Sequence, residues 1–305
     1  MTPLAALAAW GRWLLVAGLL VGIAMPTLAR AMAPAIVPFI VVMLCLAALR
    51  EGPVAALPRR AALPRTVLAV ALLQCGLPLV AAGGVWALGW IDHPLAIAAV
   101  LAMSASPITG SPGLAAMSGA NVGASLRQLS LGTALLPFTA APVFAVLPLF
   151  SDVPALLGAV ARLLLIVVLA SGIAHGLRRA FPILCEARVR PALDGAMALA
   201  MALVVIGLMS AIGPALLASP GIVAVTLAFA GGLYLLQSIG AWIATRHALP
   251  VSEAHAITIA AGNRNLALFL TAVPEDVFAP LMIFVGCYQI PMYLTPFLVA
   301  RLRGA

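Results

Sequence analysis

The 305-residue sequence contains few charged residues and no lysine at all. Only 8% of its residues are Asp, Glu, Lys or Arg, whereas about a quarter of a soluble domain is charged. A chain with so few charges and 65% apolar residues cannot cover a surface that faces water. These figures exclude a soluble globule, a nucleic-acid-binding module and a disordered chain. The composition predicts a protein embedded in the lipid bilayer.

Motifs typical of enzymes and metal sites are also missing. The apolar stretches contain no HExxH, no GxSxG nucleophile motif and no paired aspartate motif. The four cysteines, at positions 45, 75, 185 and 287, lie far apart and form no CxxC pair. We therefore interpret the chain as a non-enzyme and expect neither a metal centre nor a disulfide framework.

The long apolar stretches are rich in Ala and Leu and lack the alternation of a β-barrel strand. Because a helix needs about 20 apolar residues to cross the hydrocarbon, these stretches predict an all-α polytopic membrane protein. We expect ten transmembrane helices, at 10–29, 31–49, 66–90, 94–119, 123–150, 153–174, 192–214, 220–244, 251–273 and 276–300.

The arginines are distributed unevenly over the expected loops. One side of the membrane receives thirteen of the sixteen, namely Arg12, Arg50, Arg59, Arg60, Arg65, Arg127, Arg178, Arg179, Arg188, Arg190, Arg246, Arg301 and Arg303. The opposite loops contain one arginine, Arg30, and four acidic residues, Asp92, Asp152, Glu275 and Asp276. Since arginine accumulates in cytoplasmic loops, we expect a multi-pass protein of the cytoplasmic membrane with both termini in the cytoplasm.

Two of the expected spans are interrupted. Prolines and glycines crowd the fourth at Pro107–Gly113, and Gly262–Asn265 interrupts the ninth. Each is the fourth span of a five-helix half, so we expect residues 1–150 and 151–305 to form two inverted repeats with helices 4 and 9 broken and crossing. Ends of paired broken helices bind substrates and ions in such transporters. The alternative is two unrelated kinks caused by Pro and Gly.

Arg264 lies near the middle of the ninth expected span. A central arginine costs about 2.5–3.5 kcal/mol on insertion scales, and no Asp or Glu occupies the interior of any span. Its partner is therefore either an anionic group of a substrate or the carbonyl groups of the broken helix. Arg162, in the sixth span, has the same ambiguity between a substrate role and a snorkelling or rim-paired side chain.

Further polar residues lie in or beside the spans. The asparagines Asn121, Asn263 and Asn265 flank the two breaks, where they either line a binding site or cap the freed helix ends. Gln237 and Tyr288 are more typical of interhelical hydrogen bonds than of ligand contacts.

Three stretches carry a resemblance to a known family. They are Gln74-Cys75-Gly76-Leu77-Pro78, Asn121-Val122-Gly123-Ala124-Ser125 with Thr133 and Pro137, and Gly262-Asn263-Arg264-Asn265-Leu266-Ala267-Leu268. In these the chain resembles the bile acid:sodium symporter superfamily. The resemblance implies ten helices in two inverted halves, with the fourth and ninth helices broken and crossing. It also implies sodium binding near Gln74, Ser125 and Thr133.

The chain departs from that family where sodium would bind. The family's glutamate falls on Ala260, its glutamine on Arg264, and its Ser-Asn pair on Ser111-Pro112. Losing a carboxylate and gaining a guanidinium disfavours a cation, so we expect sodium coupling to be weak. The coupling ion stays open between sodium, a proton and none.

We interpret the protein as a secondary active transporter of a small organic anion that works by alternating access. Arg264 either holds the anion or replaces a sodium charge, and the expected substrate site also includes Asn263, Asn265, Ser111 and Asn121. Two alternatives stay open. One is sodium symport with carbonyl and hydroxyl ligands, and the other is a channel or a membrane scaffold without transport.

Overall fold

The computed structural model describes residues 3–55 and 62–303. These residues form helices joined by turns and short loops, and the β-structure among them is one isolated pair of bridged residues. Arg59 and Arg60, which contribute to the expected charge asymmetry, lie outside the described residues. Seven helical segments within the described residues are long and apolar enough to cross a membrane. They are Pro26–Gly52, Leu63–Ala87, Val122–Val146, Val153–Ala180, Ala187–Ala218, Pro220–Thr245 and Glu275–Thr295. The chain is thus a helical multi-pass membrane protein by length and composition.

Shorter helices make up the other three expected spans. The first, expected at 10–29, is covered by α2 (Gly11–Ala24) and the start of α3 (Pro26–Met32), which continues into the segment Pro26–Gly52; α1 (Pro3–Ala9) precedes it. Pro26 ends one helix and starts the next, because it lacks an N–H but its fixed φ suits a first helical position. Arg30 therefore lies on α3 rather than in the loop where the sequence placed it. The fourth and ninth spans are interrupted where Pro and Gly predicted it.

The chain folds into two compact units, each built from two separate stretches. Unit 1 comprises Met1–Val54 and Leu165–Val225, and unit 2 comprises Ala55–Leu164 and Thr226–Ala305. Each unit therefore combines part of the first expected half with part of the second. The helices α10 (Val153–Ala180) and α13 (Pro220–Thr245) contribute residues to both.

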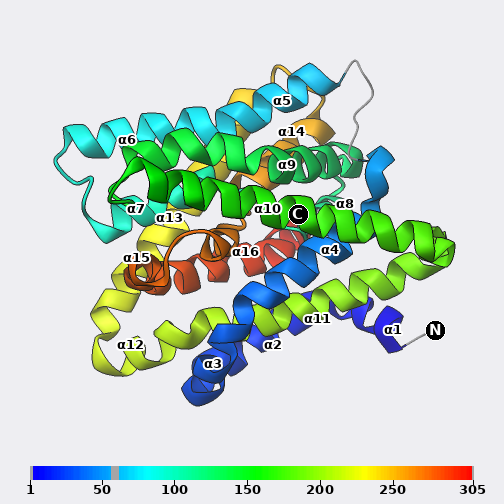
Figure 1. The fold of residues 1–305 in the computed structure, drawn as a ribbon, viewed down its shortest axis with the longest axis horizontal. Coiled ribbons are helices and arrows are strands. Elements are labelled where there is room, and N and C mark those ends of the chain that lie inside the picture. The colour runs from blue at the N-terminus through cyan, green and yellow to red at the C-terminus, as the bar shows by residue number, and fades with distance from the viewer. Residues whose placement is uncertain (1–2, 56–61, 304–305) are drawn as a thin grey trace. The chain divides into compact units, whose positions relative to one another are not determined.

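Unit 1 is organised around α11 (Arg190–Leu208), which packs along α1, α2 and α3 (Figure 1). Small residues let these helices approach closely. A Cβ atom at Gly18 would lie 2.8 Å from the carbonyl oxygen of Ala202, so the backbones are in contact there. The remaining elements are η1 (Ala33–Ala35), α4 (Ile36–Ala55), η3 (Pro182–Cys185), η4 (Ala187–Val189), η5 (Met209–Ala211) and α12 (Ile212–Ala218).

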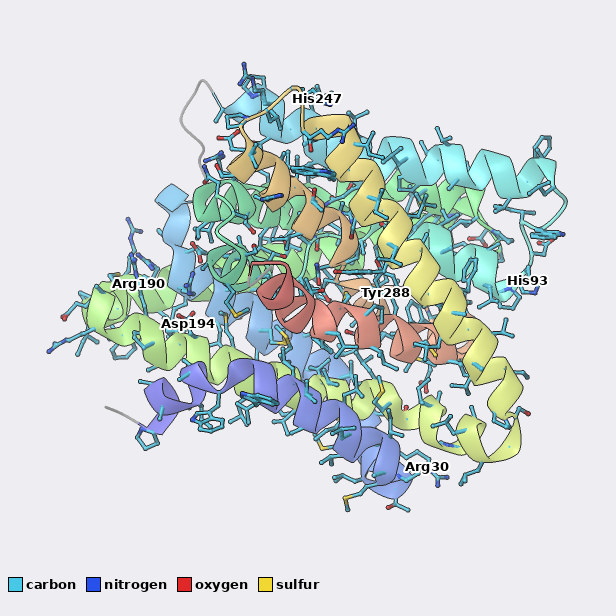
Figure 2. The ribbon with its side chains drawn as sticks, turned by 180° about the vertical axis from the view of Figure 1, so that it is seen from behind. Arg30, His93, Arg190, Asp194, His247 and Tyr288 are labelled. Atoms are coloured by element: carbon cyan, nitrogen blue, oxygen red, sulfur yellow. The ribbon has the colours of Figure 1, made fainter. Side chains whose placement is uncertain are left out.

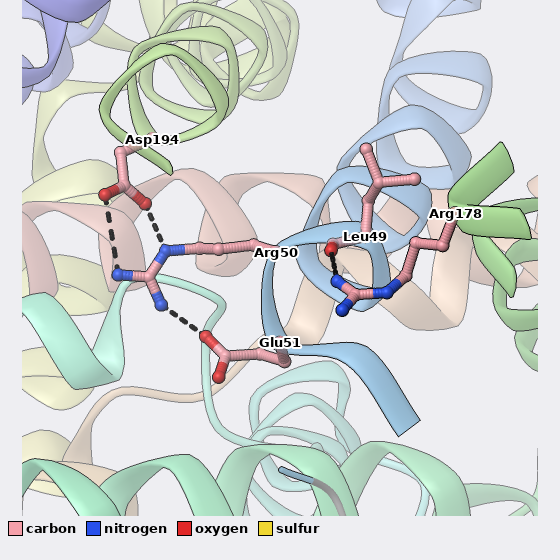
Figure 3. Close-up of polar contacts among 5 residues, drawn as sticks. All are labelled: Leu49, Arg50, Glu51, Arg178 and Asp194. Atoms are coloured by element: carbon pink, nitrogen blue, oxygen red, sulfur yellow. Dashed lines mark hydrogen bonds and ion pairs between the residues drawn. The ribbon is translucent and has the colours of Figure 1, made fainter. Parts of the chain in front are cut away.

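A polar cluster holds the end of α4 within unit 1 (Figure 3). Arg50 is paired with Asp194 of α11 and with Glu51, and Arg178 of α10 donates to the carbonyl of Leu49. The backbone turns at Gly52, whose φ of 70° favours glycine. A Cβ atom there would also lie 2.7 Å from a guanidinium nitrogen of Arg178, so a larger residue would strain the backbone and displace that side chain.

We expect Asp194→Ala to lower the free energy of unfolding by about 1 kcal/mol, because Arg50 would lose its partner on α11. The melting temperature, measured by tryptophan fluorescence, should fall by roughly 2–4 °C. Glu186→Ala is the control: its pair with Arg188 is more exposed, at 46% and 71% of the two side chains, and should contribute nothing measurable. Equal changes in both variants would contradict the role given to the Arg50 cluster.

In unit 2, the long helix α9 (Val122–Val146) packs against α5 (Leu63–Ala71), α8 (Ser111–Ser118) and α14 (Val251–Gly262) (Figure 1). Its other elements are the π-helix η2 (Leu72–Gly76), α6 (Leu77–Ala87), α7 (Pro94–Ser104), η6 (Leu266–Thr271), α15 (Glu275–Phe278), η7 (Ala279–Leu281) and α16 (Met282–Arg303). Tyr288 lies among these helices, whereas His93 and His247 lie at outer helix ends (Figure 2).

Candidate functional site

The two predicted interruptions, at residues 105–110 and 263–265, lie side by side in unit 2, and we call this place the crossing. Residues 105–110 separate α7 from α8, and residues 263–265 separate α14 from η6. Pro107 and Arg264 form an antiparallel bridge. On its two sides, the N–H of Ile108 donates to the carbonyl of Asn263 at 2.9 Å, and the N–H of Asn265 donates to Ser106 at 2.7 Å. The prediction that the breaks adjoin despite their separation in sequence is confirmed.

These main-chain bonds explain how unwound backbone is satisfied away from water. Backbone groups inside a membrane need partners within the protein, and each interruption supplies them to the other. Pro107 and Pro112 cannot continue a straight helix because they lack an N–H. The N–H of Asn265 would reach the carbonyl of Ala261 in a continuous helix, but it bonds to Ser106 instead. The carbonyl of Ala261 is thereby released.

Arg264 is almost completely buried, with 1% of its surface exposed. All three guanidinium nitrogens donate to backbone carbonyls: Nε to Ala261 at 2.9 Å, Nη1 to Ala105 at 2.9 Å and Nη2 to Leu73 at 3.2 Å. Among the described residues, no carboxylate forms an ion pair with it. Of the two interpretations that the sequence allowed, the carbonyl-bonded arginine is the one seen in the structure.

The carbonyl of Leu73 lacks its usual partner within the helix, and the sequence explains why. In the π-helix η2, the N–H of Leu77 bonds to Leu72, five residues back, instead of to Leu73. The next residue, Pro78, has no N–H to offer. Leu73 therefore lacks both of its usual helical partners, and Arg264 replaces them. We read this third span as continuous, and Pro78 is the signal that would have indicated its bulge.

Two predicted site residues use their side chains to hold the crossing together. Asn263, fully buried, donates from Nδ2 to the carbonyl of Ile259 at 2.9 Å and accepts from Thr295 at 3.2 Å. Ser111 donates from Oγ to Ile108 at 2.6 Å. Asn265 takes part through its backbone, and its side chain caps no helix end. Arg264, Asn263, Asn265 and Ser111 are thus brought together.

Asn121 lies elsewhere in unit 2. Its N–H donates to the carbonyl of Ser252, at the start of α14, and its side chain caps α9 through the N–H of Ala124. Ala261 lies nine positions after Ser252 on α14, which places Asn121 roughly 14 Å along the helix from the arginine contacts. Ser125, one turn into α9, lies at this same end. The structure therefore separates these two residues from the other four.

The residues expected near sodium do not form an oxygen cage at the crossing. The side-chain oxygen of Gln74 accepts a hydrogen bond from Thr139 at 3.1 Å. At position 260, where the sequence resemblance implies a carboxylate, the chain has only the methyl group of Ala260. Thr133 of α9 follows Gly132, which lies against Gln74 and Pro107, close to the crossing. Ser125, also of α9, lies instead beside the start of α14, away from the crossing. Because Arg264 already donates to three carbonyls, this donor set does not fit a sodium ion.

Two buried hydroxyls that we did not single out lie in the first interruption. Ser106 is fully buried and Thr109 is 6% exposed, yet neither hydroxyl has a hydrogen-bond partner among the described residues. They precede the N-terminus of α8, where backbone N–H groups favour negative charge. Gly113, in the first turn of α8, is exposed, and a Cβ atom there would meet nothing within 4 Å. The available signal was the presence of hydroxyl residues beside Pro107, with Ser106 before it and Thr109 two residues after it.

A second polar group lies on the α13 and α16 side of the crossing. Tyr288 donates to the carbonyl of Gly262 at 2.9 Å and accepts from Gln237 at 3.0 Å. Tyr234 contacts Thr295 at 2.6 Å. The prediction that Gln237 and Tyr288 form interhelical hydrogen bonds is confirmed.

Arg162 follows the same pattern as Arg264 but in an exposed position. Its Nε and Nη2 both donate to the carbonyl of Ala272, at 3.1 and 2.7 Å, where η6 ends. Both arginines of the expected span interiors thus bind backbone carbonyls at places where regular helical hydrogen bonding is interrupted.

Comparison of the chain with models of known protein families and with curated proteins finds no match. The family resemblance therefore stays a prediction from the three sequence stretches. Any function assigned to the chain has to be inferred from the geometry of the crossing.

Proposed function

We propose that the protein is a secondary active transporter that carries a small organic anion by alternating access. The observation that supports this most directly is the crossing itself, two interrupted helices joined by an antiparallel bridge inside a helical membrane protein. Interrupted helices expose backbone groups that transporters use to bind their cargo. In a membrane, such unwound backbone is otherwise costly.

The anion is placed at the N-terminus of α8 rather than on the guanidinium of Arg264. The nitrogens of Arg264 already donate to carbonyls, whereas the hydroxyls of Ser106 and Thr109 have no partner among the described residues. Hydroxyls and a helix N-terminus both donate to carboxylate, sulfonate or phosphate oxygens. Arg264, bridged to Pro107, adds a nearby positive charge that is poorly screened.

The composition of the two units supports an inverted repeat. Unit 1 takes residues 1–54 of the first expected half and residues 165–225 of the second, and unit 2 takes the closing stretch of each half together with residues 151–164. Two halves of related structure would be divided at corresponding places. Together with the arginine pattern, this favours ten spans with both termini in the cytoplasm.

Transport itself is tested in proteoliposomes loaded with buffer. The probes are three labelled anions of different size, a bile-acid conjugate, a short hydroxycarboxylate and an aryl sulfonate. A carrier gives saturable uptake of at least one probe, a channel gives uptake that rises linearly with concentration, and a scaffold gives none. Linear uptake, or none for any anion, would overturn the proposal.

We expect Thr109→Val to raise the KM for the transported probe by about tenfold, because a hydroxyl that donates to an anionic group is lost while the volume is kept. Melting temperature should not change, since this hydroxyl has no partner within the described residues. Thr245→Val is the matched control, because Thr245 donates to Ala241 of its own helix at 2.6 Å. An unchanged KM in the Thr109 variant would move the anion away from α8.

A further inference from the structure

Three backbone carbonyls converge on one point of unit 2. The oxygens of Leu73, Ala105 and Ala261 each lie within 3.2 Å of a nitrogen of the Arg264 guanidinium. They belong to three different segments, and two of those segments are more than 150 residues away from Arg264 in sequence. A converging set of carbonyl oxygens is the kind of site that binds monovalent cations in transporters.

A different local feature of the backbone leaves each of these carbonyls without a helical N–H partner. The π-helix and Pro78 free that of Leu73, and the redirected N–H of Asn265 frees that of Ala261. Ala105 directly follows the last residue of α7. The last carbonyls of α7 and α14 carry the negative ends of their helix dipoles, so two such ends point to the same place.

We propose that Arg264 is a tethered cation that fills this carbonyl site from within the chain, so that the crossing is assembled without a coupling ion. Removing the arginine leaves a site for a free guanidinium-type cation. The proposal rests on the proposed function because it concerns the coupling of that carrier. Its test nevertheless measures stability and cation binding rather than transport.

Because Arg264 occupies the three carbonyl oxygens, they cannot also form a sodium site. A sodium ion and a guanidinium cannot both use the same three oxygens, and their like charges repel. Ala260, the residue before Ala261, is buried, and its side chain has no oxygen to offer a cation. The positive charge at the crossing is therefore a permanent part of the chain, whereas a bound ion would dissociate and rebind.

The experiment uses the full chain in detergent and reads the melting temperature by tryptophan fluorescence. Arg264→Ala should melt about 10 °C below the wild type, because three buried carbonyls lose their donors. Methylguanidinium chloride should recover at least half of that loss in a saturable manner, while choline chloride at equal ionic strength should not. Arg162→Ala is the matched control: its guanidinium is exposed and binds one carbonyl, so both the loss and the recovery should be small.

The wild type provides an independent arm. Its melting temperature should be the same in sodium chloride and in choline chloride, because the site is already filled. A saturable rise with sodium would overturn the proposal, as would an Arg264→Ala variant that methylguanidinium fails to stabilise. If that variant yields no folded protein, the sodium arm decides alone. A chain that behaves as expected here but takes up no anion would overturn the proposed function and leave the tethered cation standing.

Discussion

Gly262→Ala should abolish anion uptake and lower the melting temperature by about 5 °C. A Cβ atom at this position would lie 2.2 Å from the hydroxyl oxygen of Ser238 and 3.0 Å from a ring carbon of Tyr234. The carbonyl of Gly262 also accepts from Tyr288, so the residue cannot move away without losing that bond. One added methyl group therefore pushes the end of α14 out of the crossing.

The control for this variant is Gly232→Ala on α13, where an added Cβ would meet nothing within 4 Å. An alanine there should leave uptake and melting temperature unchanged or slightly raise stability. The measurement is initial uptake in proteoliposomes together with thermal unfolding in detergent. Normal uptake by the Gly262 variant would mean that the close packing of α14 against α13 is not needed for transport.

Replacing Arg264 by Gln should reduce the initial rate of uptake by about a hundredfold, while replacing external sodium by choline should leave wild-type uptake unchanged. Gln can satisfy only part of the three carbonyls and removes the positive charge beside the anion. At 4 Å and an effective dielectric of 20, two unit charges interact by about 4 kcal/mol, or roughly three decades in affinity. A sodium ion beside the guanidinium would face a repulsion of that size.

Arg162→Gln makes the same chemical change at an exposed arginine that binds the carbonyl of Ala272, and it should transport at near wild-type rates. Collapse of wild-type uptake in choline would show that sodium drives the carrier despite the guanidinium. Normal uptake by the Arg264 variant would show that neither its charge nor its hydrogen bonds matter for transport.

The backbone breaks could be predicted from sequence because their cause is local. Two prolines and two glycines within Pro107–Gly113 forbid a continuous helix whatever surrounds them. Their adjacency followed from the matched position of the two breaks in the expected halves. The restart of a helix at Pro26 is equally local, but a proline that starts a helix and one that ends a helix read alike in an apolar stretch.

The sequence allowed carbonyl partners for Arg264 but could not say which ones, because they are main-chain oxygens of residues 73, 105 and 261. A carbonyl leaves no mark on side-chain identity, and only the tertiary fold brings these three together. Asn121 shows the opposite problem. Its type suggested a site residue, but the distance between it and the crossing is set by the packing of α9 along α14.

The hydrogen bonds that join the two interruptions run from main chain to main chain, between Ile108 and Asn263 and between Asn265 and Ser106. Such bonds survive a change of side chain, provided that the new residue is not proline. The side chains at positions 106 and 109 are therefore open to redesign. A library that varies only these two positions would alter the preference for carboxylate, sulfonate or phosphate cargo on an unchanged backbone, which makes the crossing a scaffold for engineered selectivity.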